Sequence, residues 1–234
     1  MEKTHADASP LRLHELPLDQ LPSDTRRVLE GIDRVLVYSI PMRVRFRGID
    51  VREGLLLHGE EGWGECAPFW DYDPQESAVW LASALEAARI ASRPRRSRVP
   101  LNVTIPVITA DAARQRILDA PQWMSAKVKV ADARSNLERD CRRVEAVAEA
   151  LAERHGSSAR VRVDANGAWD RESALTWIAR LNRAAGAVGG LEYVEQPCMA
   201  VEDLAWVRRK QDVPIAADES IRRAEDPLKV ARLG

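Results

Sequence analysis

Short strand-like and helix-like segments alternate over the second half of this 234-residue chain. The pattern predicts strands at residues 101–106, 126–130, 159–164, 191–195 and 215–218, and helices at residues 110–118, 133–155, 171–185 and 201–210. Strands that alternate with helices pair in parallel, because right-handed crossovers place each helix outside the sheet. The chain is therefore expected to contain an α/β domain. This domain is either an open sheet or part of a (β/α) barrel, which needs eight strands to close.

The N-terminal part of the chain has a different pattern. Antiparallel strands are expected at residues 33–41, 54–58 and 62–66, followed by a helix at residues 74–90. Asp73 is placed to cap this helix, and Pro74 suits its first turn. The segment at 91–99, rich in Arg, Ser and Pro, is the best linker candidate. We therefore expect an α+β domain over residues 1–99 and the α/β domain over residues 100–234.

Composition excludes several classes of protein. The 35 basic and 36 acidic residues leave a net charge of −1, so no bulk field favours nucleic acid or an anionic membrane. The three cysteines are widely spaced, which predicts neither a disulfide framework nor a zinc site. Residues 1–10 are polar, and no apolar run approaches the roughly 18 residues of a membrane span. We therefore expect a cytoplasmic protein with no nucleic-acid or membrane partner.

Charged side chains gather near the carboxyl ends of the predicted strands. They are Lys127, Lys129, Arg162, Asp164, Glu195 and Asp218. Side chains alternate along a strand, so the two lysines share one side of theirs, and Arg162 shares a side with Asp164. The three carboxylates are separated by 31 residues (195 minus 164) and 23 residues (218 minus 195), each the length of one βα unit. They are therefore expected on successive strands, at the end where a barrel builds its active site.

Three converging carboxylates would repel one another without a cation. Mg²⁺ prefers oxygen ligands, so the pattern predicts a Mg²⁺ site at Asp164, Glu195 and Asp218. A metal beside lysines suits the removal of a proton next to a substrate carboxylate, because the metal stabilises the enediolate while a lysine acts as the base. The alternative is a structural layer of Lys–Asp ion pairs that plugs the barrel.

These residues together resemble the muconate-lactonizing-enzyme subgroup of the enolase superfamily. The resemblance covers about residues 33–234 and rests on the motifs Lys127-x-Lys129, Asp164-x-Asn166, Glu195-Gln196-Pro197, Asp218-Glu219-Ser220 and Gly62-Trp63-Gly64-Glu65. It implies a (β/α) barrel, with its last units missing from this sequence, and an N-terminal α+β capping domain. It also implies that the three carboxylates bind Mg²⁺ and that Lys129 is the base, tuned by Lys127. Arg162 and Asn166 become contacts of a small-molecule carboxylate substrate.

Within that subgroup, residues 41–54 resemble the capping-domain sequence of o-succinylbenzoate synthases of menaquinone biosynthesis. This implies a lyase reaction, the Mg²⁺-dependent syn elimination of water from 2-succinyl-6-hydroxy-2,4-cyclohexadiene-1-carboxylate. A racemase or epimerase of N-acylated amino acids or dipeptides would use the same residues, and a muconate-type cycloisomerase is a third possibility. A non-catalytic binding protein is disfavoured, because clustered buried charges are costly to keep without a partner. The oligomeric state is not predicted.

The resemblance also bears on completeness and on the capping loops. The family carries another lysine on the sixth barrel strand, and this sequence stops before that strand. Lys229, in the preceding helix, is poorly placed to replace it. We therefore expect the chain to be a fragment, or to depend on further sequence for activity. Phe69 and Trp70 are expected in a capping loop, where they line the substrate pocket or pack between domains.

Overall fold

The computed structural model describes residues 11–233 apart from residues 47–48, 92–93, 121 and 223–225. The side chains of residues 43–46 also lie outside the described part. The chain divides into two compact units, residues 1–97 and residues 98–234, and each has its own buried core. The predicted boundary between residues 99 and 100 lies close to this division.

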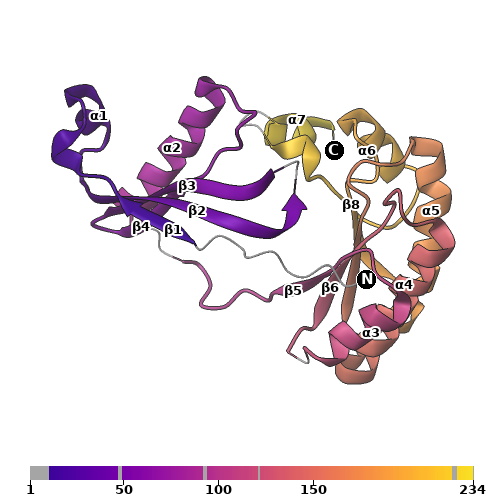
Figure 1. The fold of residues 1–234 in the computed structure, drawn as a ribbon. Helices are drawn as coiled ribbons and strands as arrows, with labels where there is room; N and C mark the ends of the chain where they lie inside the picture. The colour runs from indigo at the N-terminus through magenta and orange to yellow at the C-terminus, as the bar shows by residue number, and fades with distance from the viewer. Residues whose placement is uncertain (1–10, 47–48, 92–93, 121, 223–225, 234) are drawn as a thin grey trace. The chain divides into compact units, whose positions relative to one another are not determined.

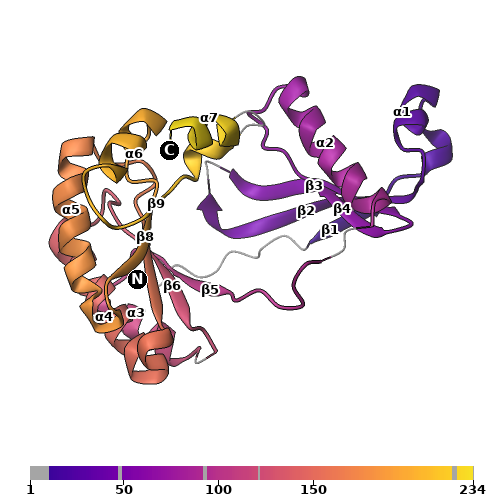
Figure 2. The same cartoon turned by 180° about the vertical axis from the view of Figure 1, so that it is seen from behind.

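The first unit contains a four-stranded antiparallel sheet with the strand order β1-β2-β3-β4. Its elements are β1 (Arg12–Glu15), the 3-10 turn η1 (Leu18–Gln20), α1 (Ser23–Val28), β2 (Ile32–Phe46), β3 (Ile49–Gly59), β4 (Gly62–Cys66) and α2 (Pro74–Arg89). Figures 1 and 2 show α2 lying along the sheet. This arrangement confirms the predicted α+β architecture. Sequence reasoning missed β1 and α1, which bury no side chain and so lack apolar periodicity.

Helix α2 is held to the sheet by its cap and its apolar face. The Asp73 side chain accepts a hydrogen bond of 2.8 Å from the backbone N–H of Glu76, so the predicted N-cap is confirmed. The buried core of this unit consists of Ile32, Val35, Leu57, Cys66, Ala84, Leu85 and Ala88. Three of these residues come from α2, at positions that share one helix face. The cap therefore starts the helix and the apolar stripe orients it.

The second unit contains a five-stranded parallel sheet whose strand order follows the chain, β5-β6-β7-β8-β9. Its strands are β5 (Asn102–Ile105), β6 (Ser125–Lys129), β7 (Arg160–Asp164), β8 (Leu191–Glu195) and β9 (Ile215–Ala216). Its helices are α3 (Ala110–Leu118), α4 (Leu137–His155), α5 (Arg171–Ala184), α6 (Val201–Arg208) and α7 (Asp226–Leu233), with 3-10 turns η2 (Gly156–Ser158), η3 (Gly186–Val188) and η4 (Glu219–Ile221). Helices α3 to α6 lie side by side along one face of the sheet (Figures 1 and 2). The predicted α/β pattern is confirmed.

Alternation along the strands decides which face of the parallel sheet meets the helices. On β6, Val128 is fully buried, while Lys127 and Lys129 keep part of their surface accessible. The same alternation recurs on β7, where Val161 and Val163 are fully buried. The helices that cover these valines contribute apolar side chains to the same core. Separately, no helix in the described ranges is long and apolar enough to cross a membrane. The opposite face of the sheet is left to charged side chains.

Several elements of the second unit differ from the prediction by a few residues, and local hydrogen bonds explain two of these differences. Helix α4 begins at Leu137 rather than at residue 133, because the Asn136 side chain caps it and the Asp132 side chain bonds the backbone N–H of Arg134. Strand β9 is short, because the backbone N–H of Asp218 donates to a side chain, Gln196, rather than to a neighbouring strand. In both places local side-chain hydrogen bonds replace those of regular structure.

Candidate active site

Charged side chains meet at the carboxyl ends of β6, β7 and β8. The parallel register pairs Lys129 with Asp164, and Asp164 with Glu195. Paired residues on neighbouring strands point to the same side of a sheet, so these three side chains form one row on the face away from the helices. Lys127 lies two residues before Lys129 and therefore shares this face. Four of the predicted site residues are thus brought together by strand register alone.

The two lysines and two carboxylates form a hydrogen-bonded cluster. Lys127 Nζ lies 2.7 Å from Glu195 Oε1 and 3.3 Å from Asp164 Oδ2. Lys129 Nζ lies 2.5 Å from the same Asp164 oxygen and donates a second hydrogen bond, of 3.0 Å, to Asn166 Oδ1. Asp164 is fully buried, and both lysine side chains are largely covered. Asp164 therefore holds its charge between two ammonium groups.

Burial and charge act in opposite directions on these groups. Burial alone would raise the pKa of Asp164, but the hydrogen bond and the charge of Lys129 outweigh it and the pKa is lowered from its usual value. Burial also raises the pKa of Glu195, and the negative charges of Asp164 and Asp218 add to this effect. Burial opposes the charge on Lys127, yet the hydrogen bond to Glu195 raises the pKa of that lysine overall. Glu195 is therefore easier to protonate than a free carboxyl group, although Lys127 contacts it.

Asp218 belongs to the same cluster through its charge rather than through a direct hydrogen bond in the described arrangement. It follows β9 by two residues and directly precedes the 3-10 turn η4. Its backbone N–H donates a hydrogen bond of 2.7 Å to the side chain of Gln196. Its carboxylate is close enough to raise the pKa of Glu195. The three predicted carboxylates therefore lie at the ends of β7 and β8 and just beyond the end of β9.

A divalent cation fits this donor set in its chemistry. Asp164, Glu195 and Asp218 supply the oxygen ligands that Mg²⁺ prefers, and a cation would offset the burial and the repulsion that together raise the pKa of Glu195. In this arrangement, the ammonium groups of Lys127 and Lys129 contact carboxylate oxygens of Asp164 and Glu195. Within the described ranges, no three His, Cys, Asp or Glu side chains lie close enough together to hold an ion. Binding would require the ammonium groups to move off these oxygens. The metal assignment stays a prediction.

Arg162 lies on the same face as Asp164 but engages a different set of groups. Its Nε donates to Glu192 Oε2 at 2.5 Å, and its Nη1 donates to Asn102 Oδ1 at 2.8 Å. Glu192 reaches this arginine because β8 bulges there: the step from Val161 to Arg162 on β7 matches two residues on β8. The guanidinium also stacks over the ring of Tyr193 at 5.1 Å. This network ties β5, β7 and β8 together below the lysine cluster.

Two further residues take part that sequence reasoning placed only inside motifs. Glu219 accepts a 3.2 Å hydrogen bond from Asn166 Nδ2, so a chain of contacts runs from Lys129 through Asn166 to Glu219. Its second oxygen, Oε2, is buried and has no hydrogen-bond partner in the part of the chain that the structure describes. Gln196 is fully buried, and its side-chain oxygen accepts hydrogen bonds from the backbone N–H groups of Asp218 and Ser220. Gln196 follows Glu195 in the sequence, and Glu219 follows Asp218. These positions indicated that both residues lie near the site, but they did not indicate which groups the two side chains bond.

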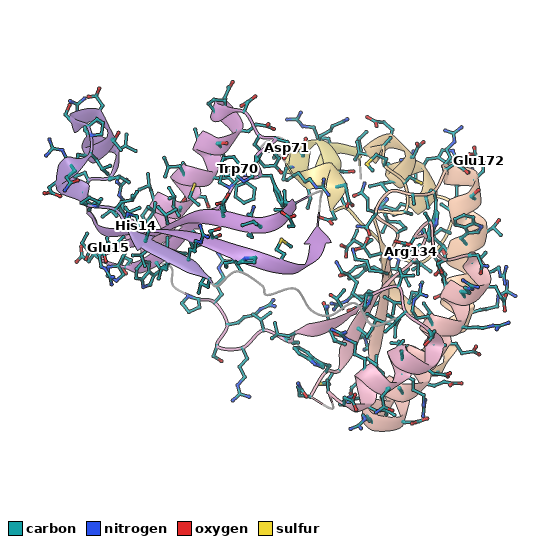
Figure 3. All side chains as sticks on the ribbon, in the orientation of Figure 1. His14, Glu15, Trp70, Asp71, Arg134 and Glu172 are labelled. Atoms are coloured by element: carbon teal, nitrogen blue, oxygen red, sulfur yellow. The ribbon has the colours of Figure 1, made fainter. Side chains whose placement is uncertain are left out.

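The remaining predicted residues lie elsewhere. Lys229 on α7 forms an exposed ion pair of 3.0 Å with Glu202 on α6. Phe69 and Trp70 belong to the first unit, where they line a cavity of about 430 Å³ between β3, β4 and the start of α2. Trp70, labelled in Figure 3, is 76% exposed, while the Arg52 guanidinium stacks on the Phe69 ring. Residues 41–54 carried the capping-domain resemblance, and within them the side chains of residues 43–48 lie outside the described part.

Comparison with known proteins supports a relationship over most of the chain. A protein of Mycolicibacterium smegmatis named o-succinylbenzoate synthase is 50% identical over 202 residues, which are 86% of this chain and 60% of that protein. The chain thus spans about three fifths of the length of this curated relative. The predicted similarity to o-succinylbenzoate synthases is confirmed at the level of sequence.

Two solved structures have a similar fold. A dipeptide epimerase from Enterococcus faecalis matches with a TM-score of 0.62 and 20% identity, over 86% of this chain and 71% of that one. An o-succinylbenzoate synthase from Thermosynechococcus elongatus, complexed with Mg in the active site, matches with a TM-score of 0.56 and 22% identity, over 94% and 71%. The fold is therefore part of a (β/α) barrel with an N-terminal α+β domain, as predicted.

Two family models match consecutive parts of the chain. The model described as "Enolase N-terminal domain-like" matches residues 37–88, and the model described as "Enolase C-terminal domain-like" matches residues 109–234, which is more than half of the chain. The strand-end charges lie within the second match. The chain therefore belongs to the enolase superfamily.

Proposed function

We propose that this chain carries the catalytic strands of an o-succinylbenzoate synthase of menaquinone biosynthesis. The observation that carries the proposal is the cluster of Lys127 and Lys129 against Asp164 and Glu195, at the carboxyl ends of three consecutive strands. The identity of 50% to a protein named o-succinylbenzoate synthase supports this choice of substrate. The reaction is a syn elimination of water from 2-succinyl-6-hydroxy-2,4-cyclohexadiene-1-carboxylate.

Asp164, Glu195 and Asp218 would hold Mg²⁺, as three oxygen donors from successive strands. When bound, the ion supplies positive charge that polarises the substrate carboxylate and stabilises negative charge developing next to it. A magnesium ion in a solved synthase structure supports this choice of metal. Asp164 Oδ2 is shared by both lysines, so binding of a cation at this oxygen would replace its contacts with Lys127 and Lys129.

Lys129 is the proposed base. Its amine takes the α-proton of the substrate, and the resulting ammonium group returns a proton to the departing hydroxide, which leaves as water. Lys127 keeps a positive charge beside Lys129, and by the resemblance to the family it approaches the substrate carboxylate. Asn166 orients the Lys129 amine through their 3.0 Å hydrogen bond. Asn166 and Arg162 stay predicted substrate contacts, and the network of Arg162 supports the strand that carries Asp164.

The decisive experiment is the Mg²⁺-dependent loss of the diene absorbance of the synthase substrate. It should be run on the 234-residue chain and on the longest reading frame that contains it. Lys129→Ala is expected to lower turnover by about 100-fold to 10,000-fold, the usual contribution of a positioned base. Lys229→Ala is the matched control, because that lysine forms an exposed ion pair away from the cluster, and it should leave turnover unchanged. Equal effects of the two substitutions would contradict the role of Lys129.

A second candidate uses the same residues. The similarity in fold to a dipeptide epimerase leaves open an N-acylamino acid racemase or dipeptide epimerase, in which Lys129 would exchange the α-proton of an amino acid derivative. Incubation with N-acylated amino acids and dipeptides in deuterated water distinguishes the two. Mg²⁺-dependent exchange of the α-proton without turnover of the synthase substrate would replace the synthase by the racemase.

A further inference from the structure

Gln196 is the first residue after β8 and directly follows Glu195 in the sequence. Its side chain is fully buried. Its backbone has a φ of 39°, in the left-handed region that a residue with a side chain adopts only when its surroundings stabilise it. The main chain therefore turns sharply away from the sheet at this residue, and β8 can no longer pair with β9 through its backbone beyond this point.

The side-chain amide of Gln196 continues the pairing in place of the backbone. Its Oε1 accepts hydrogen bonds from the backbone N–H groups of Asp218, at 2.7 Å, and Ser220, at 3.3 Å. Its Nε2 donates to Ser220 Oγ at 2.6 Å and lies within hydrogen-bond distance of the Cys198 and Met199 carbonyl oxygens, at 3.0 and 3.4 Å. Both ends of the amide are therefore satisfied, and the segment that carries Asp218 is fastened to the end of β8.

The backbone of the same residue joins the other strand ends. The N–H of Gln196 donates to Ala216 at the end of β9, at 2.8 Å. Its carbonyl oxygen accepts a 2.7 Å hydrogen bond from the N–H of Gly167, in the turn that follows β7. Gln196 thus forms hydrogen bonds with the turns after β7 and β9 and itself lies in the turn after β8. These are the three turns that adjoin Asp164, Glu195 and Asp218.

Regular pairing by itself holds Asp218 only weakly. Strand β9 has two residues, and their register with β8 ends at the pair of Glu195 with Ala216. Beyond that pair, the amide of Gln196 supplies the hydrogen bonds to the Asp218 segment that reach back to β8. A short strand with few ladder bonds opens readily, so the position of Asp218 depends on this contact.

We propose that Gln196 is a positioning residue, which holds the Asp218 segment against the end of β8 so that the carboxylates of Asp164, Glu195 and Asp218 converge. The inference deepens the proposed function and rests on it for the identity of the metal. Gln196 itself touches neither carboxylate nor substrate in this role. Its effect on metal binding arises because orienting groups behind a ligand set its affinity.

The test compares two glutamines that both bridge the backbone with their amides. Gln196→Met keeps a similar volume but removes the amide. Gln211→Met is the matched control, because Gln211 also bonds with both ends of its amide, to Val213 N and Val213 O at 2.6 Å each, but in the loop before β9. Amide hydrogen exchange at Asp218 and Ser220 and calorimetric titration with MgCl₂ are measured for both variants and the unchanged chain.

In Gln196→Met, exchange at Asp218 and Ser220 is expected to quicken by about 10-fold or more, and Mg²⁺ affinity to fall by about 10-fold to 100-fold. Gln211→Met should change either quantity by less than about 3-fold. Unaltered exchange at Asp218, or faster exchange with unaltered Mg²⁺ affinity, would overturn the proposal. Equal losses in the two variants would also overturn it, because the effect would then be general.

Two safeguards keep the result decisive. If Gln196→Met does not fold, Gln196→Asn replaces it, because Asn tolerates a left-handed backbone but holds its amide one methylene short of Asp218. The same changes in exchange and affinity are expected. If the unchanged chain binds no Mg²⁺, the metal assignment of the proposed function fails. The positioning role of Gln196 is then tested by amide hydrogen exchange at Asp218 and Ser220 alone. Unchanged protection of these amides in the variant contradicts the proposal.

Discussion

In the described part of the second unit, the buried charged residues Asp140, Arg143, Asp164 and Glu195 each contact an opposite charge. Asp164 illustrates the rule at the strand ends, since two lysines contact its buried carboxylate. Asp140 and Arg143 illustrate it on α4, where the two side chains are almost fully buried and lie 2.5 Å apart. Burying either charge without its partner would cost several kcal/mol. The pairs therefore differ in position but follow one physical requirement.

The pair on α4 also supports the strand that carries Lys129. Arg143 Nη2 donates to the Lys129 carbonyl oxygen at 2.8 Å, and Nη1 donates to the Ile108 carbonyl oxygen at 3.1 Å. Asp140 Oδ2 accepts from the backbone N–H of Ala131, whose φ is 63°. The turn after β6 is thus held by an ion pair that lies outside the predicted site.

Arg143→Met is expected to lower the free energy of unfolding by about 3–5 kcal/mol, because it leaves Asp140 charged and unpaired in the interior. Arg142→Met is the neighbouring control. Arg142 forms an exposed ion pair with Glu138, and its replacement should cost about 0.5 kcal/mol or less. Urea denaturation of both variants measures the difference. Similar losses in the two variants would show that the buried pair adds no special stability.

At the level of elements, strand ends in the second unit share a backbone feature. Ala131, Asn166 and Gln196 each have a positive φ and lie one or two residues after β6, β7 and β8. A residue in the left-handed region changes the direction of the backbone sharply, so each strand ends close to the charged residue at its carboxyl end. None of the three is glycine, so their conformations are held by hydrogen bonds of the surrounding turns.

In the first unit, the contact between α2 and β4 depends on a missing side chain. A Cβ placed on Gly64 would lie 1.9 Å from the backbone oxygen of Ala84, on α2. Gly64→Ala is therefore expected to lower the free energy of unfolding of this unit by at least about 2 kcal/mol, since neither backbone can move without the other element.

The control for this prediction is Gly186→Ala in η3, where an added Cβ meets no atom within 4 Å. It should change stability by less than about 1 kcal/mol. Hydrogen exchange of α2 amides, followed separately from those of the parallel sheet, reports the first unit alone. Unchanged protection of α2 in Gly64→Ala would contradict the close packing of helix and strand.

On the scale of the whole molecule, the two units have separate cores and are joined by an exposed basic segment. Arg95, Arg96 and Arg98 are all exposed and lie outside helices and strands. Limited digestion with trypsin is expected to cut first after one of these arginines, because an extended, exposed backbone fits a protease better than a folded one. Mass spectrometry of the first fragments identifies the site.

Replacing all three arginines with glutamine should slow the first cleavage and leave the two units joined. Exposed arginines within helices, such as Arg180 on α5 and Arg208 on α6, serve as internal controls that should be cut later. Early cleavage at either of them would mean that the parallel sheet opens before the linking segment is attacked.

The sequence by itself determined the order and kind of most elements and the residues that gather at the strand ends. Strand periodicity separated Val128 from Lys127 and Lys129 correctly, because side-chain alternation is a property of the extended backbone and needs no partner. The spacing of Asp164, Glu195 and Asp218 likewise follows from one βα unit for each carboxylate. Such features are local or repeat at regular intervals, and a linear pattern can carry them.

Only the tertiary structure decided which groups those residues contact. Gln196 and Arg143 each bond some backbone atoms that lie 14 to 35 residues away, and nothing in their immediate sequence indicates these distant partners. The bulge that turns Glu192 toward Arg162 arises from pairing between two strands, so it belongs to neither strand alone. Periodicity predicts the face on which a side chain lies. Its hydrogen-bond partners depend on how distant turns pack, and that is settled only when the chain is folded.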